Sequence, residues 1–398
     1  MAMKRTRPGN RGYWARGGAV LVLIGVLALG CGTSNAGQPE KSASGSAVER
    51  TTTTVVKPVT TTVTVTTWTT STTTAAPLTS LPIAGPGIQA EISVYGSQLI
   101  HNPSGIAAGP DGALWFTNTG DGSIGRITTD GVITSYRVVG LPPQSGSGVA
   151  AQLVAGPDGA LWFTWGNQIG RMTTAGVCTL LTGQNVSFAQ GITVGPDGAM
   201  WFADGNSIGR VTTAGSVTIF QNPDIHTPVG IAAGPDGALW FSDTFGTGSI
   251  GRITTSGVVS TFTGGDGYSS QVLDPIGITA GADGALWFTN GGGGTIGRIT
   301  PNGVVTNYSS VDVVGSAYVG DLEAGPGITA GPDGAIWFVN GKSIGRIPTS
   351  GKVTLYASKD IATPLWITAG PDGALWFTNG ANSIGRISTT PTAHVSMP

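Results

Sequence analysis

The sequence predicts an all-β fold, a seven-bladed β-propeller built from four-stranded antiparallel blades. Three observations support this prediction. The segment Gly-Pro-Asp-Gly-Ala-Leu-Trp-Phe-Thr-Asn at 370–379 occurs in closely similar form seven times, and an Ile-Gly-Arg segment follows every copy. Successive copies are 39 to 50 residues apart, a spacing that is typical of propeller blades.

Each repeat contains four short β-branched or aromatic runs separated by turn residues. The Pro-Asp-Gly segment suits a type I turn between the first two strands, because proline presets φ at the second turn position. Leu-Trp-Phe is apolar on both faces, so the second strand is expected to be buried on both sides. We interpret the repeated residues as structural, with aspartate capping the turn and arginine bonding backbone carbonyls between blades.

The N-terminal strand is expected to complete the last blade. The seventh repeat stops after 384–388 without a fourth strand, and residues 91–95 upstream of the first repeat resemble the fourth strands of other repeats. Their pairing would close the ring and remove an exposed edge. The propeller is therefore predicted to span 87–390, followed by a tail at 391–398.

Residues 1–31 are predicted to be a signal peptide with a lipobox-like cleavage site. Five basic residues precede an apolar run at 19–29, which is short for a bilayer span. The segment ends in Ala-Leu-Gly-Cys, which resembles the bacterial lipobox, so lipidation of Cys31 is expected. We expect an outward-facing membrane lipoprotein, or a secreted protein if Cys31 carries no lipid, with membrane contact only through this anchor.

Residues 32–86 are predicted to be a disordered linker. Between 51 and 75, 15 of 25 residues are threonine, and such a run buries too little apolar area to offset its ordering entropy. Charged residues make up only 10% of the chain and the net charge is −2, so no nucleic-acid partner is expected. We expect a monomer, with Cys178 as a small buried apolar residue.

Differences between the repeats predict where a ligand would bind. Length varies in the connections between the second and third strands and between the fourth strand and the next repeat, and both emerge on one face of an up-and-down blade. That face carries loop residues and the residues that end the second strands. The candidate ligand-binding residues are His101, Asn118, Trp165, Asp204, Asp243, Tyr268, Asn340 and Asn379.

The repeated Gly-Pro-Asp-Gly-x-Leu-Trp-Phe-Thr unit, followed by Ile-Gly-Arg-Ile, resembles that of the virginiamycin B lyase (streptogramin lyase) family. The resemblance covers all seven repeats. It implies a seven-bladed propeller that linearises cyclic depsipeptide antibiotics by Mg²⁺-dependent elimination at an ester. It also implies a site made of Glu-Pro-His-Gly at the start of a first strand and a glutamate ending the second strand of the same blade.

The fifth repeat matches that motif best, with Asp274-Pro-Ile-Gly and Asn290. Asp274 and Asn290 are thus the candidate Mg²⁺ ligands, although a neutral amide is a weaker ligand than a carboxylate for this cation. Ile276 stands at the histidine position and cannot transfer a proton. The family's catalytic histidine and glutamate are therefore not matched, and the candidate catalytic residues are His226 and Asp274.

Three hypotheses follow. The missing histidine and glutamate favour an exported ligand-binding envelope protein, whose partner would be a small molecule, a peptide or an envelope component. The alternative is a Mg²⁺-dependent carbon–oxygen lyase that linearises streptogramin B type depsipeptides, with a site rearranged around Asp274, His226 and Asp243. The third is a sugar-lactone hydrolase of gluconolactonase type, with Asp204, Asp243, Asn290 and Asn118 around a central cation.

Overall fold

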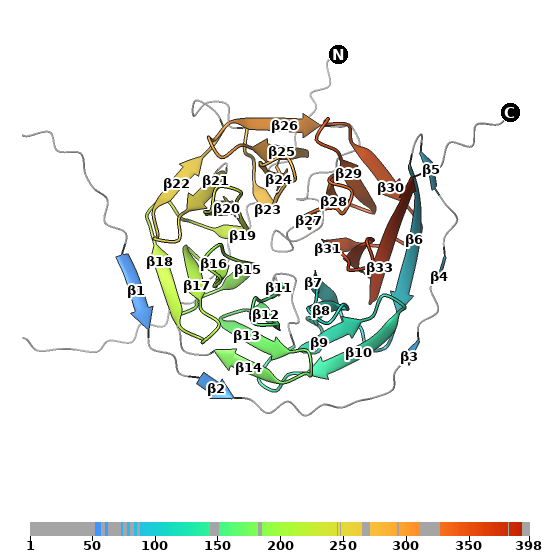
Figure 1. Cartoon of the computed structure of the whole chain (residues 1–398), viewed down its shortest axis with the longest axis horizontal. Helices are drawn as coiled ribbons and strands as arrows, with labels where there is room; N and C mark the ends of the chain where they lie inside the picture. The colour runs from blue at the N-terminus through green and yellow to red at the C-terminus, as the bar shows by residue number, and fades with distance from the viewer. Residues whose placement is uncertain are drawn as a thin grey trace, which may run out of the picture. The chain divides into compact units, whose positions relative to one another are not determined.

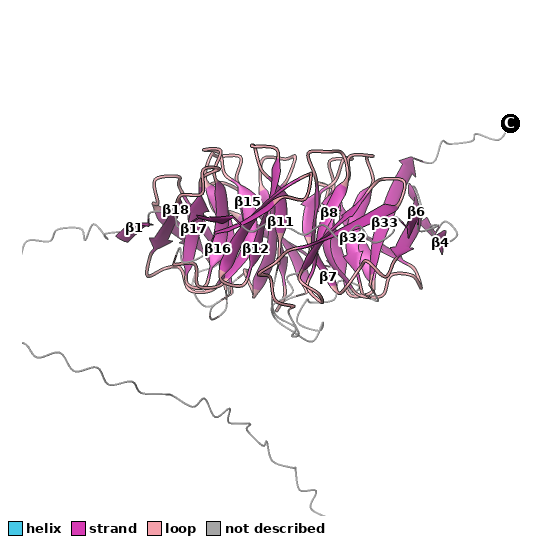
Figure 2. Cartoon of the chain, turned by 90° about the horizontal axis from the view of Figure 1, so that it is seen from below, coloured by secondary structure: helices cyan, strands magenta, loops and turns pink. Residues whose placement is uncertain are grey.

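The computed structural model is a ring of seven antiparallel sheets (Figure 1), which confirms the predicted propeller. Residues are described at 52–56, 60–62, 73–74, 78–79, 83–85, 88–143, 151–181, 185–244, 246, 248–264, 271–292, 294–309, 327–380 and 382–391. Seen from the side, the strands cross the thickness of the ring and the connecting loops lie on its two faces (Figure 2). Within the described ranges, no helix has the length and apolar character needed to cross a membrane.

Each blade has its first strand at the centre of the ring and its fourth at the rim. Blades 1 to 3 are formed by β7 (Pro103–Ala108), β8 (Leu114–Asn118), β9 (Ser123–Ile127) and β10 (Val132–Arg137); β11 (Leu153–Ala155), β12 (Ala160–Trp165), β13 (Gln168–Thr173) and β14 (Cys178–Leu181); and β15 (Ala189–Val194), β16 (Met200–Asp204), β17 (Ser207–Val211) and β18 (Val217–Gln221).

Blades 4 to 6 repeat this order, and blade 7 takes its outer strand from the N-terminal side. The strands are β19 (Pro228–Ala233), β20 (Leu239–Asp243), β21 (Ser249–Ile253) and β22 (Val259–Phe262); β23 (Pro275–Ala280), β24 (Leu286–Asn290), β25 (Thr295–Ile299) and β26 (Val305–Ser309); β27 (Ile328–Ala330), β28 (Ile336–Asn340), β29 (Ser343–Ile347) and β30 (Thr354–Ala357); and β31 (Pro364–Ala369), β32 (Leu375–Asn379), β33 (Ser383–Pro391) and β6 (Ile88–Gly96).

The ring closes as predicted, between strands from opposite ends of the chain. β6 pairs antiparallel with β33, from Gly96 opposite Ser383 to Ile88 opposite Pro391. Beside this seam, the Asn102 N–H donates to Asn382 Oδ1 at 2.8 Å. The N-terminal strand therefore completes the last blade and leaves no open gap in the ring.

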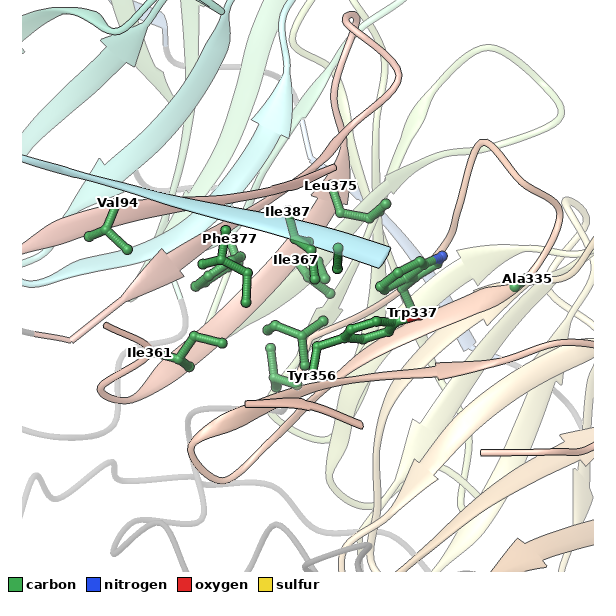
Figure 3. Packing of buried hydrophobic residues seen from close by; sticks show 13 residues of the cluster. Val94, Ala335, Trp337, Tyr356, Ile361, Ile367, Leu375, Phe377 and Ile387 are labelled. Atoms are coloured by element: carbon green, nitrogen blue, oxygen red, sulfur yellow. The ribbon is translucent and has the colours of Figure 1, made fainter. Parts of the chain in front are cut away.

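The core lies between adjacent blades. The second strands are buried on both faces, as predicted, with tryptophan packing toward the following blade and leucine and phenylalanine toward the preceding one. Between blades 6 and 7, Trp337 and Tyr356 pack near Leu375 and Phe377 (Figure 3). The glycine of each third strand makes room for the phenylalanine, because a Cβ at Gly125 would collide with the Phe116 ring. Cys178 is buried as expected, and burial raises the pKa of its thiol to about 12.

The repeated aspartate, tryptophan and arginine form one bonded triad in each blade. In blade 1, Trp115 Nε1 donates to Asp111 Oδ1 at 2.9 Å, and Arg126 Nε lies 2.7 Å from Asp111 Oδ2. The same two bonds recur in the other six blades, with Arg–Asp distances of 2.6 to 2.7 Å. The structural interpretation is supported, but one detail was wrong: arginine bonds the aspartate of its own blade. A carboxylate satisfies the guanidinium better than a carbonyl does.

The triad also sets the protonation of its carboxylate. Burial raises the pKa of Asp111, but hydrogen bonds from Trp115 and Arg126 outweigh that effect and hold the pKa below its ordinary value. The other six triad aspartates have lowered pKa values for the same reasons. These carboxylates are therefore ionised structural groups rather than proton donors.

Part of the predicted linker is paired with the ring. The described residues within 32–86 form five short strands: β1 (Thr52–Val56), β2 (Thr60–Thr62), β3 (Thr73–Thr74), β4 (Leu78–Thr79) and β5 (Ile83–Gly85). For these residues the structure differs from the expectation of disorder, because threonine is β-branched and suits an edge strand when a pairing partner is present. The predicted signal peptide, Cys31 and residues 392–398 lie outside the described residues.

Candidate functional site

The polar residues that end the second strands hold the loops leading into the first strands of the same blades. Asn118 Oδ1 accepts the His101 N–H at 3.0 Å, and Asn379 Oδ1 accepts the Ala362 N–H at 2.9 Å. In three other blades the backbone N–H groups of the equivalent residues donate to these side chains: Ser187 to Asp204, His226 to Asp243, and Leu273 to Asn290. In every case the donor precedes the acceptor by 17 residues. All five side chains are buried. Their described contacts give them a structural role, and ligand binding by them stays a prediction.

The remaining ligand-binding candidates are also placed by the structure where it describes them. Trp165 is buried, and its Nε1 donates to the Pro142 carbonyl at 3.3 Å, which holds the loop leading into blade 2. Asn340 is buried, with its Nδ2 3.2 Å from Ser343 Oγ. Tyr268 lies outside the described residues.

Blade 4 places a histidine against a buried carboxylate. His226 Nδ1 lies 3.5 Å from Asp243 Oδ2, and 44% of the histidine side chain is exposed against 2% for the aspartate. The same carboxylate accepts the backbone N–H groups of His226 and Thr227 at 2.8 and 2.9 Å, which fix its position. A partly exposed histidine in contact with a carboxylate is suited to act as a general base on a ligand that binds at the loop face of the propeller.

His101 occupies the equivalent position in blade 1 but has different surroundings. Its own second strand ends in Asn118, which is neutral. Its Nε2 instead lies 3.7 Å from Asp121 Oδ2, and both side chains are exposed, by 44% and 37%. An ion pair between exposed groups contributes little. Asp121 was missed at the sequence level, because the connection that carries it varies in length between repeats.

Asp274 and Asn290 do not fit a Mg²⁺ site. Asn290 Oδ1 accepts the Leu273 N–H at 3.0 Å, and its Nδ2 donates to the Gln271 carbonyl and to Thr295 Oγ1, each at 3.0 Å. With only 2% of Asn290 exposed, its amide is committed to the loop. Mg²⁺ needs several oxygen ligands around it, and among the described residues no group of three His, Cys, Asp or Glu side chains could hold a metal. No metal step is derived for this chain.

Asp274 is nevertheless an unusual residue at the edge of blades 4 and 5. Its backbone φ is +46°, and its carbonyl accepts the Gly291 N–H at 2.9 Å. The backbone nitrogen of Asp274 lies close to Gly248 of blade 4, so Asp274 packs against that blade. The structure thus places Asp274 and the His226–Asp243 pair on neighbouring blades.

Ile276, which stands at the position of the family's histidine, is buried and bonded to the neighbouring blade. Ile276 is 4% exposed, and its carbonyl accepts Ser242 Oγ of blade 4 at 2.6 Å. Equivalent hydroxyl bonds link blades 7 and 1 through Thr378, 1 and 2 through Thr117, and 2 and 3 through Thr164. These inner hydroxyls were missed at the sequence level, although a threonine or serine after Leu-Trp-Phe was a visible signal.

Comparison with known proteins identifies the family. The model of the virginiamycin B lyase family matches residues 57–269 and 314–397. This chain belongs to the virginiamycin B lyase family. The resemblance stated from the repeats is thereby confirmed. Among curated proteins, no match to the chain was found.

Solved structures of lyases agree with this assignment. The chain is 32% identical to a catalytically inactive virginiamycin B lyase from Staphylococcus aureus with Quinupristin, with 75% of this chain and 99% of that chain covered at a TM-score of 0.63. A streptogramin B lyase structure is 30% identical, with 76% and 98% covered at a TM-score of 0.62. The similarity therefore spans nearly the whole of each lyase.

Proposed function

We propose that this protein is a carbon–oxygen lyase that opens ester-closed cyclic depsipeptides of the streptogramin B type. One observation carries the proposal: the chain is 32% identical to a lyase over a match that covers 99% of that enzyme. The family model matches blades 1 to 4, 6 and 7 and leaves out residues 270–313, which contain blade 5.

The reaction class needs a base on the loop face. In elimination at an ester, a base removes the proton from the carbon beside a carbonyl, a C=C bond forms, and the C–O bond breaks to release a carboxylate. His226 is the side chain that we assign to this role, because Asp243 holds its Nδ1 side at 3.5 Å and 44% of the side chain remains exposed. Asp243 acts as a positioning residue that also stabilises the protonated imidazole.

A second candidate function is binding of the same ligand class without turnover. Ile276 favours it, since an apolar side chain stands where the resemblance places the catalytic histidine. The other described residues at this position are Ser104, Ala151, Gln190, Val229 and Leu365. If His226 does not replace the missing base, the loop face would still bind the depsipeptide but would not catalyse its elimination.

The deciding experiment incubates the full chain with a streptogramin B depsipeptide, with Mg²⁺ and with a chelator. The linear product is an isomer of the cyclic substrate, so it must be separated by chromatography and identified by tandem mass spectrometry. We expect product, and we expect His226→Gln to lower kcat by at least about 100-fold. His101→Gln is the matched control, because His101 stands at the same position in blade 1, and it is expected to leave kcat unchanged.

The other outcomes separate the hypotheses. Saturable binding without product would support the binding function and overturn the lyase proposal. Product that is unaffected by His226→Gln would leave the lyase in place but remove His226 as its base. Loss of product in the chelator would show that the reaction depends on a metal ion, and loss of product in Asp274→Ala as well would overturn the conclusion that Asp274 and Asn290 do not hold it.

We further propose that the protein is exported and carries lipid on Cys31. Support comes from the basic residues, the short apolar run and the Ala-Leu-Gly-Cys segment at 1–31. An enzyme outside the membrane would meet such antibiotics before they reach the cytoplasm. The mass of the mature N-terminus after membrane extraction tests this: a diacylglyceryl adduct on Cys31 supports it, and an uncleaved leader or an unmodified secreted chain contradicts it.

A further inference from the structure

The five short strands of the threonine-rich segment lie along the rim of consecutive blades. β1 pairs with β18 of blade 3, β2 with β14 of blade 2, β3 with β10 of blade 1, and both β4 and β5 with β6 of blade 7. The chain thus passes the blades in the order 3, 2, 1 and 7 before it enters the ring as β6 (Figure 1). Each of these pairings is antiparallel and extends the sheet outward.

The fourth strands match this arrangement in their sequences. In each fourth strand, one residue pairs with the glycine of the third strand, and the polarity of this residue differs between blades. Where a rim strand pairs with it, the residue is apolar and buried: Leu180 opposite Thr61, Ile219 opposite Thr54 and Val94 opposite Leu78. In blades 4 and 5, whose outer strands have no such partner among the described residues, the same position is Thr261 and Asn307, both exposed.

In blade 1 the residue at this position is polar, because the rim strand pairs with other residues of the fourth strand. Its rim strand β3 pairs only with Val132 and Ile133 and stops short of the position in question. The residue there is Ser135, which is polar and half-buried. Blade 6 is intermediate, with Leu355 half-buried. Buried apolar side chains therefore occur at this position where a rim strand reaches it, whereas Leu355 is apolar but only half-buried.

The bonds between blades divide the ring at the same places. Hydroxyl bonds join blades 7 to 1, 1 to 2 and 2 to 3, and Ser242 joins blade 4 to blade 5 in the same way. The residue that would supply the hydroxyl is Ala203 between blades 3 and 4 and Val339 between blades 6 and 7, so neither junction has this bond. The blades with rim strands, 7, 1, 2 and 3, therefore form one run of hydroxyl-linked blades, and the linked blades 4 and 5 lie outside it.

We propose that β1 to β5 form a strap, a set of strands that extends the sheets of blades 3, 2, 1 and 7 and stabilises that part of the ring as one unit. An exposed sheet edge is a template for unwanted pairing, and a strand supplied by the same chain covers it at high effective concentration. The strap separates the ring into a strapped part and blades 4 to 6, which carry the His226–Asp243 pair. These five strands are thus part of the propeller rather than of a disordered linker.

Cysteine pairing tests the position of the strap in the full chain. In a Cys31→Ser background, Thr52→Cys with Gln221→Cys joins residues that are directly opposite in the β1–β18 register. The control pair is Thr52→Cys with Thr263→Cys, because Thr263 is the counterpart of Gln221 in blade 4 and is also exposed. Directly opposite antiparallel residues have Cα atoms close enough for a disulfide.

We expect at least about tenfold more disulfide, mapped by peptide mass spectrometry, in the blade 3 pair than in the blade 4 pair. A freely moving linker would reach both positions, so equal yields would overturn the proposal. No disulfide in either pair would overturn it as well. Neither variant touches the core, so failure to fold is not expected to obscure the result.

Amide hydrogen exchange gives a second measurement that needs no disulfide. Thr54→Pro removes one N–H donor and distorts β1, whereas Thr54→Ala keeps the backbone donor. We expect amides of β18 to exchange at least about tenfold faster in the proline variant and at the parental rate in the alanine variant. Exchange in β18 as fast as in β22 of the parental chain, with no effect of proline, would contradict the strap.

Discussion

Blades 7, 1, 2 and 3 differ from blades 4, 5 and 6 in what surrounds an almost identical repeat. The first group has rim strands from the N-terminal segment, and hydroxyl bonds join all of its successive blades; in the second group such a bond joins blade 4 to blade 5. The second group contains His226, Asp243 and Asp274, and two of the longest connections in the chain lead into its blades 5 and 6. The comparison teaches that the described rim strands and the candidate catalytic residues lie on different parts of the ring.

The difference cannot come from the repeated residues, because these are the same in both parts. Trp115 in blade 1 and Trp240 in blade 4 are both fully buried, and each donates to its aspartate at 2.9 Å. Their stacking partners, Tyr136 and Phe262, lie at 5.3 and 5.4 Å. Function and reinforcement are therefore carried by positions at which the repeats diverge.

Removal of a triad tryptophan is expected to have the largest effect. Trp240→Ala should lower the free energy of unfolding by about 3–5 kcal/mol, because it leaves a large cavity and a carboxylate oxygen without its donor. Trp115→Ala should cost the same within about 1 kcal/mol, since the two sites match. Denaturant unfolding of both variants measures this. A clearly smaller loss in blade 1 would show that the strap limits the damage in its own part of the ring.

Acid is expected to act on both parts together. The pKa values of the triad aspartates are lower in the folded chain than the ordinary value, so their stabilisation is present above about pH 4 and is lost as the pH falls through the folded values. The free energy of unfolding should therefore fall below about pH 4. Asp236→Asn should weaken this dependence, and Asp224→Asn, which changes an exposed residue outside the triads, should not. Unfolding curves that are independent of pH in this range would contradict the assignment.

The smallest expected effect concerns the hydroxyls between blades. Ser242→Ala removes the bond to the Ile276 carbonyl and should cost about 1–2 kcal/mol, since it also leaves the buried Gly230 N–H without its acceptor. Ala203→Ser is the reverse test. The backbone of Gly191 approaches Val229 as closely as that of Gly230 approaches Ile276, so an added hydroxyl should reach the Val229 carbonyl.

Ala203→Ser is therefore expected to raise the free energy of unfolding by up to about 1 kcal/mol, as measured by denaturant unfolding. It would connect blade 4 to blade 3 by the kind of bond that joins blades 7, 1, 2 and 3 to one another. A loss of stability in this variant would mean that the missing hydroxyl is not what distinguishes the junction.

The sequence by itself determined the number of blades, the order of the strands and the closure by the N-terminal strand. Each of these depends on local patterns that recur seven times, and repetition makes a weak strand signal unambiguous. The family followed from the same repeats. Burial of Leu-Trp-Phe on both faces was predictable because apolar side chains alternate on a pleated strand.

Only the tertiary structure decided what individual polar residues do. Asn118, Asp204, Asp243, Asn290 and Asn379 were candidates for a ligand-binding face, but folding brings each of them onto a backbone N–H located 17 residues earlier. The threonine-rich segment likewise has too few apolar residues to predict a partner, and its strands form where the rims of four blades present backbone groups. Contacts of this kind depend on geometry between distant segments, which composition and spacing do not contain.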